Sequence, residues 1–434
     1  MRTVKYLLVI SLLFLAGSTF AQKLPNVEDF TVNGIRVILR QSPNQIVAIG
    51  AIFRGGYAYN ETNNPYIAEG MANLTTSSGS EKYPKDKFRA LKSRLVTTIT
   101  GGGDFYDTQY WLRCVKPNFD QSWDMFSDVI MHPLYDDVEF RNQKENDINN
   151  INNRSSSPDG YAYFLGDSAW RSGNARFGRI TEVPDIQNTT IADMKQFHNK
   201  ILQRGRMYVV VVGNVSKQEI TKKLGDFASQ AEGNNMMAYS SNNYPPPDQT
   251  KFIYDSRPDI PTTYIYGFTS SPDRNDPDFW PSRLTASYLR EKFFQEVRTK
   301  RNLSYAPFAF ITGGMHNYRF VLGVSTTRPD SAIGVMLNEI KKVQNGDIDT
   351  KMLNDEKNVY ITRYYQGKTT NLGQAQELYG AIRETGDWHD AYTIDKILTV
   401  TPEQAKQYAE KYLHNILYSI SGPTSGVTES KFHF

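Results

Sequence analysis

Apolar and polar residues alternate along two segments of the chain, 105–115 (FYDTQYWLRCV) and 318–326 (YRFVLGVST). Alternation with a period of two is typical of a half-buried antiparallel strand. Segment 82–95 instead has helical spacing, with Phe88, Leu91 and Leu95 on one face and lysines and arginines on the other. Further helical patterns cover 69–78 and 282–301, and the runs at 206–214 and 416–423 predict closing strands.

Much of this pattern occurs twice. The string ITGG starts at Ile99 and again at Ile311, a shift of 311 − 99 = 212 residues. Four further segment pairs keep the same order at nearly the same shift: Asn73–Thr75 with Arg283–Thr285, Lys144–Asn146 with Glu356–Asn358, 190–197 (TIADMKQF) with 401–408 (TPEQAKQY), and the two closing strands. We therefore predict an internal duplication.

The repeat predicts the fold class and the domains. Helices and strands are mixed without strict βαβ order, which favours an α+β fold. We expect two homologous domains, each an antiparallel sheet with helices on one face, that together form a clamp. The predicted boundaries are 22–230 and 250–434. The polar, proline-rich segment 231–249 between them has the composition of a linker.

The first residues predict export. Arg2 and Lys5 precede an apolar run, and the small residues that follow end in Ala21 before Gln22. This is the pattern of a signal peptide over residues 1–21. The run is short for a membrane span, although an uncleaved N-terminal anchor is the alternative. We expect a periplasmic or secreted protein with no membrane span after cleavage.

Composition excludes several classes. The formal net charge is +3, from 49 basic and 46 acidic residues, which argues against a nucleic-acid-binding protein. Cys114 is the only cysteine, so the chain has no intrachain disulfide and no cysteine metal cluster. We expect Cys114 to be a buried, inert thiol.

Common catalytic motifs are also missing. No two of the six histidines lie within four positions, which excludes a helix with two histidine zinc ligands. The chain has no nucleophile elbow, phosphate-binding loop or dinucleotide fingerprint. Gly101–Gly103 precede a strand instead of a helix, so we interpret them as a hairpin turn.

The duplicated order of strand, helix and glycine-marked hairpin resembles the insulinase/pitrilysin-type (M16) metallopeptidase family over residues 28–425. Active members carry H-x-x-E-H on the first-half helix and a distal glutamate as the third zinc ligand. The matching segment here is YIAEGMANLTTSSGS (66–80), and two registers are open. One places Glu69, Ala72 and Asn73 at the motif; the other places Gly70, Asn73 and Leu74 there. The distal position falls near Asn150. No register supplies an imidazole, so the resemblance implies a zinc site that has been lost, with no metal or other cofactor in this chain.

The second half keeps a different feature of the family. LREKFFQEVRTKRNLSYAPFAF (289–310) resembles the second-domain segment whose arginine and tyrosine reach into the active cavity. The matching residues are Arg298 and Tyr305. We expect a helix C-terminus at Lys300–Asn302 and a strand that starts at Tyr305. The side chains of Arg298 and Tyr305 would then both point past the end of this helix into the clamp. Some M16 proteases divide labour between a zinc-bearing subunit and a homologous partner that supplies this pair.

The sequence therefore resembles the non-zinc subunit of a heteromeric M16 peptidase. In this hypothesis Arg298 and Tyr305 stabilise the scissile carbonyl and oxyanion in a zinc-bearing H-x-x-E-H partner, with peptides as substrates. An extended peptide would add to a sheet edge near 98–108 or 310–321. Two alternatives stay open: a peptide-binding or scaffold protein without catalysis, and an independent hydrolase built on Asp104, Asp107, Asp136 and Asp137.

Overall fold

The structure is a computed structural model that describes residues 26–57, 64–172, 180–228, 233, 247–315 and 317–434. The predicted signal peptide and most of the predicted linker lie outside the described residues. Among the helices it describes, none is both long and apolar enough to cross a bilayer.

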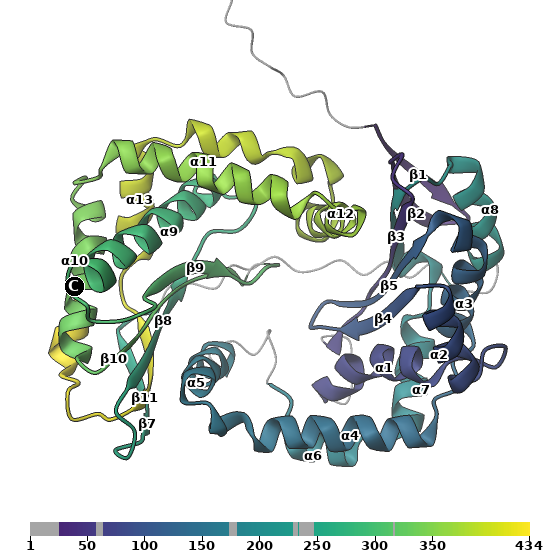
Figure 1. The fold of residues 1–434 in the computed structure, drawn as a ribbon, viewed down its shortest axis with the longest axis horizontal. Helices are drawn as coiled ribbons and strands as arrows, with labels where there is room; N and C mark the ends of the chain where they lie inside the picture. Colours follow the sequence, from purple (N-terminus) through teal and green to yellow (C-terminus); the bar gives the residue numbers. More distant parts are fainter. Residues whose placement is uncertain (1–25, 58–63, 173–179, 229–232, 234–246, 316) are drawn as a thin grey trace, which may run out of the picture.

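Two β-sheets form the centres of two domains (Figure 1). The first sheet contains β1 (Val27–Val32), β2 (Ile35–Gln41), β3 (Ile46–Arg54), β4 (Thr98–Gly103), β5 (Asp107–Val115) and β6 (Met207–Gly213). The second contains β7 (Lys251–Ser256), β8 (Thr263–Ser270), β9 (Phe308–Thr312), β10 (Arg319–Thr326) and β11 (Leu417–Gly422).

Thirteen α-helices surround the sheets in the described part of the chain. In the first half they are α1 (Pro65–Ser78), α2 (Lys85–Arg94), α3 (Phe119–Met131), α4 (Asp137–Asn152), α5 (Pro158–Ser172), α6 (Val183–Asn188), α7 (Ile191–Ile201) and α8 (Lys217–Ala228). In the second half they are α9 (Phe279–Phe293), α10 (Pro329–Gln344), α11 (Thr350–Gly367), α12 (Asn371–Thr385) and α13 (Pro402–Tyr412).

The strand order repeats, which confirms the α+β class with two related domains. The first sheet runs β1-β2-β6-β3-β5-β4 and the second β7-β11-β8-β10-β9, so the order of five strands is the same in both. The sheets are not purely antiparallel as predicted. β2 pairs with β6 in parallel, and β7 pairs with β11 in parallel, at corresponding places. Helices α7 and α13 begin with the same capping box, at Thr190 and Thr401, as their matching sequences require.

The ITGG strings, by contrast, are not equivalent. Ile99 lies in β4 and pairs with Leu112, 13 residues later, whereas Ile311 in β9 pairs with Phe320, nine residues later. Gly101–Gly103 do not form the hairpin turn that we expected, because they belong to β4. A Cβ at Gly101 or Gly103 would lie 2.3 or 2.0 Å from carbonyl oxygens of α1. The glycines therefore let β4 pack closely on α1.

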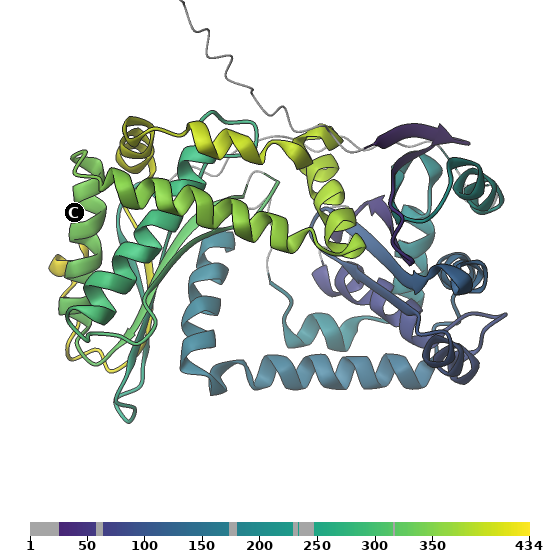
Figure 2. The same ribbon diagram turned by 45° about the horizontal axis from the view of Figure 1, so that its top comes forward.

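Each sheet buries both faces, which corrects the prediction of helices on one face. One face packs against helices of its own half, in two large hydrophobic cores. The opposite face of the first sheet, with Ile38, Ile52 and Val210, packs against Leu378 and Ile382 of α12 from the second half. The opposite face of the second sheet, with Phe268 and Val321, packs against Ala162 and Trp170 of α5 from the first half. The two halves therefore exchange one helix each (Figures 1 and 2).

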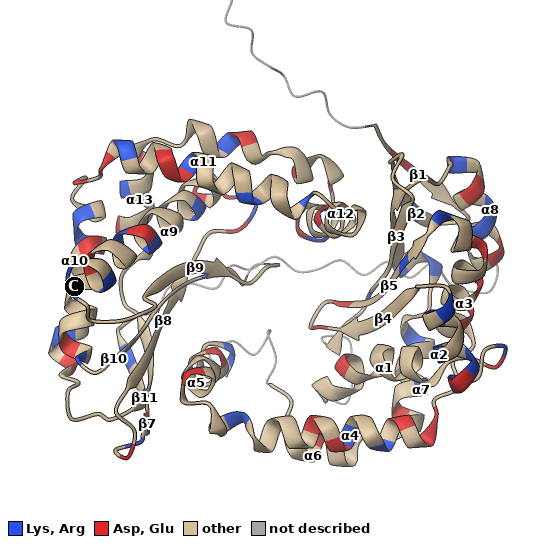
Figure 3. Ribbon diagram, in the orientation of Figure 1, with Lys and Arg blue, Asp and Glu red and all other residues tan. Residues whose placement is uncertain are grey.

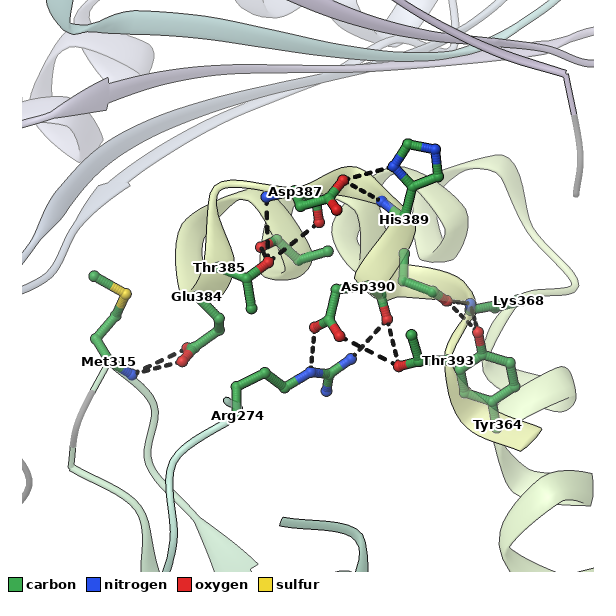
Figure 4. A network of polar contacts seen from close by, with 12 residues as sticks. Arg274, Met315, Tyr364, Lys368, Glu384, Thr385, Asp387, His389, Asp390 and Thr393 are labelled. Atoms are coloured by element: carbon green, nitrogen blue, oxygen red, sulfur yellow. Dashed lines mark hydrogen bonds and ion pairs between the residues drawn. The ribbon is translucent and has the colours of Figure 1, made fainter. Parts of the chain in front are cut away.

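The two hairpins that close these sheets also contact each other. The Tyr106 hydroxyl, in the β4–β5 turn, donates to the Met315 carbonyl in the β9–β10 turn at 2.7 Å. The Met315 amide in turn donates to the Glu384 carboxylate at the end of α12, at 2.9 Å (Figure 4). Nearby, Arg274 forms an ion pair with Asp390 and fixes the segment that follows α12 (Figure 4). These polar contacts hold α12 in place between the domains.

Two smaller predictions are confirmed. Cys114 is buried, and burial raises the pKa of its thiol to about 11. The basic segment forms α2, with Phe88 and Leu91 buried on its inner face. The carboxylates of the hydrolase alternative lie in two places: Asp104 and Asp107 both contact Arg383, whereas Asp136 and Asp137 lie at the start of α4. Asp136 caps this helix through the amides of Val138 and Glu139.

Candidate functional site

The first half contains a pocket of about 330 Å³ between α1 and α4, which is lined by Tyr66, Glu69, Gly70, Asn73, Gln143, Asp147, Asn150, Ile151, Arg154, Ile180, Thr181 and Ile186. Helix α1 starts there because Asn64 caps the Tyr66 amide and Pro65 occupies the first turn. The pocket includes four positions that the family resemblance matches to zinc ligands or their neighbours: Glu69, Gly70, Asn73 and Asn150.

The pocket favours one of the two motif registers. Glu69 and Asn73 both line it, together with Asn150. Leu74, which the other register requires, is fully buried in the hydrophobic core of the first half. Only the first register therefore places both helix positions beside the distal position.

An amide network crosses the space between α1 and α4. The Gln143 side chain donates to the Gly70 carbonyl at 3.1 Å and accepts from the Asn73 amide at 3.3 Å. A Cβ at Gly70 would lie 2.7 Å from Gln143 Nε2, so glycine permits this approach. Sequence reasoning missed Gln143. Its position seven residues before Asn150, on the same face of α4, is the spacing that would have identified it.

The two carboxylates in the pocket already have hydrogen-bond donors. Glu69 Oε2 accepts from the Thr181 hydroxyl at 2.6 Å, and Asp147 Oδ2 accepts from the Tyr66 hydroxyl at 3.0 Å. Burial raises the pKa of both carboxyl groups. Partial desolvation makes their charged forms less favourable, and at Glu69 it outweighs the opposing charge of the Arg171 guanidinium.

These residues do not fit a zinc ion. Protein ligands for zinc are thiolates, imidazoles and carboxylates, and a site needs at least three of them. Here the positions facing Glu69 hold amides and a glycine. Over the described ranges of the chain, no group of three or more His, Cys, Asp or Glu side chains is placed to hold a metal ion. The residues that line this pocket therefore lack a complete set of zinc ligands.

Arg298 and Tyr305 lie together in the second half. The Arg298 guanidinium carbon is 4.1 Å from the centre of the Tyr305 ring and 4.8 Å from that of Phe294. Tyr305 is 77% exposed, and Arg298 is partly exposed. The pair is a stacked cation–π unit at the surface, so both side chains are available to a second molecule.

The chain around this pair differs from the prediction in one respect. After α9, residues Phe294–Thr299 form a π-helical turn, and Asn302 has a left-handed φ of 47° that ends it. Tyr305 does not start a strand, because β9 begins at Phe308. Lys300 and Arg301 each donate to the Glu296 carboxylate at 2.6 Å, and these bonds lower its pKa to about 2. The turn that carries Arg298 is thus anchored by an ion-pair cluster.

The pocket and the stacked pair remain separate within one chain. The pocket belongs to α1 and α4, whereas the pair follows α9. Across the described residues, no hydrogen bond, ion pair or ring contact joins Arg298 or Tyr305 to a residue that lines the pocket.

Comparison with known proteins places the chain in a family. Residues 36–175 match the sequence profile described as insulinase (peptidase family M16), and residues 188–360 match the profile described as the peptidase M16 inactive domain. A curated relative, the zinc protease PqqE of Helicobacter pylori, is 26% identical over 227 residues. This match spans 50% of the present chain and only 51% of that relative.

Solved structures share the fold at low sequence identity. A peptidase M16 inactive domain from Pseudomonas fluorescens has a TM-score of 0.82 at 16% identity, over 93% of this chain and 100% of the other. A protease from Helicobacter pylori has a TM-score of 0.78 at 16% identity, covering 92% and 99%. The periplasmic protease PqqL of Escherichia coli has a TM-score of 0.75 at 13% identity, and the match covers 91% of this chain but 46% of PqqL. The two profiles between them span most of the chain, and they show that the protein belongs to the insulinase-type peptidase family M16.

Proposed function

We propose that this chain is the non-zinc subunit of a heteromeric M16 peptidase. The observation that carries the proposal is the surface stack of Arg298 on Tyr305, 4.1 Å apart, in a chain whose own zinc pocket holds amides. In this role the chain supplies hydrogen-bond donors, and a homologous H-x-x-E-H partner supplies the zinc.

The chemistry of the pair suits this division. A guanidinium and a phenol hydroxyl are both donors, and the guanidinium also carries a fixed positive charge. Donors aimed at a scissile carbonyl stabilise the negative charge that develops on its oxygen. The Arg298 guanidinium has a second ring contact: its carbon lies 4.8 Å from the centre of the Phe294 ring. This contact orients the guanidinium and leaves its hydrogen-bond donors available. Phe294 would therefore be a positioning residue.

The location of the pair supports action in trans. Because Arg298 and Tyr305 have no described contact with the pocket on α1 and α4, they are better placed to serve a cavity completed by another molecule. We further propose export to the periplasm or outside the cell, on the basis of the N-terminal sequence pattern. Cell fractionation with N-terminal sequencing tests this, and a mature protein that starts near Gln22 is the expected result.

A peptide-binding or scaffold role without catalysis is the second candidate. The observation that favours it is the amide network of Gln143, Asn73 and Gly70, which crosses the former metal position. In this case the Arg298–Tyr305 stack would contribute contacts to a partner but no rate enhancement.

One experiment separates the two candidates. The chain is co-purified with a zinc-bearing M16 homologue from the same cells, and cleavage of a fluorogenic peptide is measured for wild type, Arg298→Ala and Tyr305→Phe. We expect each substitution to lower kcat by about 10²–10³-fold, the usual loss for an oxyanion donor. Matched controls are Arg94→Ala, on exposed α2, and Tyr254→Phe, on β7, which should keep the wild-type rate. If the wild type and a variant with both Arg298→Ala and Tyr305→Phe cleave the peptide equally well, the catalytic role is rejected.

A further inference from the structure

A second pocket, of about 340 Å³, lies in the second half between α9 and α11, beside strand β9. Three arginines line it: Arg283 and Arg290 from α9, and Arg363 from α11. Both helices carry blue segments in Figure 3, which marks lysine and arginine. None of these arginines has a role in the proposed function.

This pocket is the counterpart of the former zinc pocket. Asn73 lines the first pocket and Arg283 the second, at a shift of 283 − 73 = 210 residues, and each is followed by a buried Leu–Thr pair. Helices α1 and α4 border the first pocket, and α9 and α11 border the second. The duplication has thus produced one pocket with two carboxylates and one pocket rich in guanidinium groups.

The positive charge of the second pocket is only partly balanced. Glu356 is the only carboxylate within 4 Å of any of the three guanidinium groups in the part of the chain that the structure describes, at 3.7 Å from Arg290 Nη2. Only Arg290 therefore has a carboxylate within that distance, and the same carboxylate also accepts a bond from the Ser287 hydroxyl at 2.5 Å. Burial, with the like charge of Arg363, lowers the pKa of Arg290. An anion bound here would relieve this repulsion.

The pocket opens beside an unpaired strand edge. β9 is the last strand of its sheet and pairs only with β10 among the described strands. Ala309, Phe310 and Ile311 of β9 line the pocket, and Phe310 is 38% exposed. Arg283 Nη1 lies 3.4 Å from the Ile311 carbonyl oxygen, so its guanidinium sits at the strand edge. A peptide paired along β9 would direct alternate side chains toward the arginines.

We propose that this pocket binds the carboxylate of an acidic residue in an extended peptide that pairs with β9. Guanidinium groups bind carboxylates through charge-assisted, often bidentate hydrogen bonds. Tyr360 and Tyr364 of α11 and Phe310 of β9 supply apolar walls for the stem of that side chain. The proposal adds a preference for acidic peptides to the proposed function, on which its biological role rests, but binding itself requires no partner subunit.

The test measures binding by the full chain alone. Fluorescein-labelled nine-residue peptides of valine, threonine and serine carry one glutamate at each position in turn, and a matched set carries glutamine. Each peptide is made with a C-terminal amide and with a free acid, which separates side-chain carboxylates from the terminal carboxylate. Fluorescence anisotropy is recorded for wild type, Arg363→Gln, Arg290→Gln and the control Arg94→Gln. Arg363 and Arg94 are both exposed, so both variants should fold.

We expect at least one glutamate position to bind about ten-fold more tightly than its glutamine match as the amide. Arg363→Gln and Arg290→Gln should each remove most of this preference, and Arg94→Gln should retain it. Equal affinity of all glutamate and glutamine peptides overturns the proposal. Three other results also overturn the proposal. The preference for glutamate survives in both pocket variants, it falls equally in Arg94→Gln, or only the peptides with a free terminal acid show it. These outcomes do not depend on cleavage, so they are distinct from failure of the Arg298–Tyr305 proposal.

Discussion

Arg383 of α12 donates through Nη1 to Asp104 in the β4–β5 hairpin at 2.8 Å, although the two residues are 279 positions apart. The same guanidinium donates to the Tyr379 hydroxyl at 2.7 Å, and that hydroxyl donates to Asp107 at 3.2 Å. Asp107 is 1% exposed. A buried polar cluster therefore joins the exchanged helix of the second half to the sheet of the first.

Arg383→Met should destabilise the protein strongly, because it removes the guanidinium that lies 3.5 Å from the buried Asp107 carboxylate. Removing one partner of a buried ion pair typically costs about 3 kcal/mol or more. We expect a loss of that size in the free energy of urea unfolding at pH 7. The control Arg94→Met, at the exposed end of α2, should change it by less than about 0.5 kcal/mol. A loss no larger than that of the control would show that the cluster contributes little.

Glycine-to-alanine substitutions in the two exchanged helices should have opposite effects. A Cβ at Gly166 in α5 would lie 2.0 Å from the buried Phe268 ring, whereas a Cβ at Gly380 in α12 meets nothing within 4 Å. Gly166→Ala should therefore cost about 1–3 kcal/mol through overpacking. Gly380→Ala should gain about 0.5–1 kcal/mol, because alanine favours the helix. Differential scanning calorimetry of both variants gives the signs, and equal signs would contradict this account of the packing.

The buried imidazole of His198 should make the fold sensitive to mild acid. It is 2% exposed, its Nδ1 lies 2.5 Å from the Tyr135 hydroxyl, and burial lowers its pKa to about 4. The unfolded chain, with a pKa of about 6.5, binds the proton more readily between these values. The contribution of neutral His198 to the free energy of unfolding is therefore complete above about pH 6.5. It falls by up to about 3 kcal/mol as the pH drops toward 4.

Urea unfolding at pH 7.5 and pH 5 tests this dependence. His198→Gln should show a smaller loss between the two pH values than the wild type. His132→Gln replaces an exposed histidine and should leave the wild-type dependence intact. Identical pH dependence in wild type and His198→Gln would remove His198 as its source.

Zinc binding should be recoverable at the first-half pocket. Glu69→His, Asn73→His and Asn150→Glu together place two imidazoles and a carboxylate at positions that share one pocket. We expect about one zinc ion per chain in this triple variant and none in the wild type, measured by metal analysis after dialysis. The double variant without Asn150→Glu is the control and should bind zinc more weakly. Absence of zinc in the folded triple variant would mean that these positions no longer have ligand geometry.

Local patterns predicted much of the fold. The segments matched at 190–197 and 401–408 both begin a helix with a threonine capping box, because capping depends only on neighbouring residues. The same holds for the amphipathic helix that buries Phe88 and Leu91. Arg298 and Tyr305 are only seven positions apart, at the end of the π-helical turn and in the segment after it, so a local match of the sequence was enough to predict that they lie close together.

Long-range relationships were beyond these patterns. Trp170 packs against the second sheet, and Leu378 packs against the first. Both contacts join apolar faces that are far apart in the sequence, and no local motif indicates which faces will meet. Over five residues, the hydrophobic pattern of a strand buried on both faces differs little from that of a strand buried on one face. The sequence analysis therefore missed the second buried face of each sheet. Gly101 and Gly103 were assigned to a turn because glycine is common there, but here close approach of α1 requires them.

The helix exchange bears on how such a protein arose. A single copy of the repeat would leave one apolar sheet face uncovered, and the helix that is exchanged (α5 or α12) would have no sheet to pack against. Before the two copies shared one gene, a stable form would have been a symmetric pair of identical chains, each lending that helix to the other. Fusion made assembly independent of protein concentration. It would also allow the copies to differ, so that one carries amides and carboxylates where the other carries arginines.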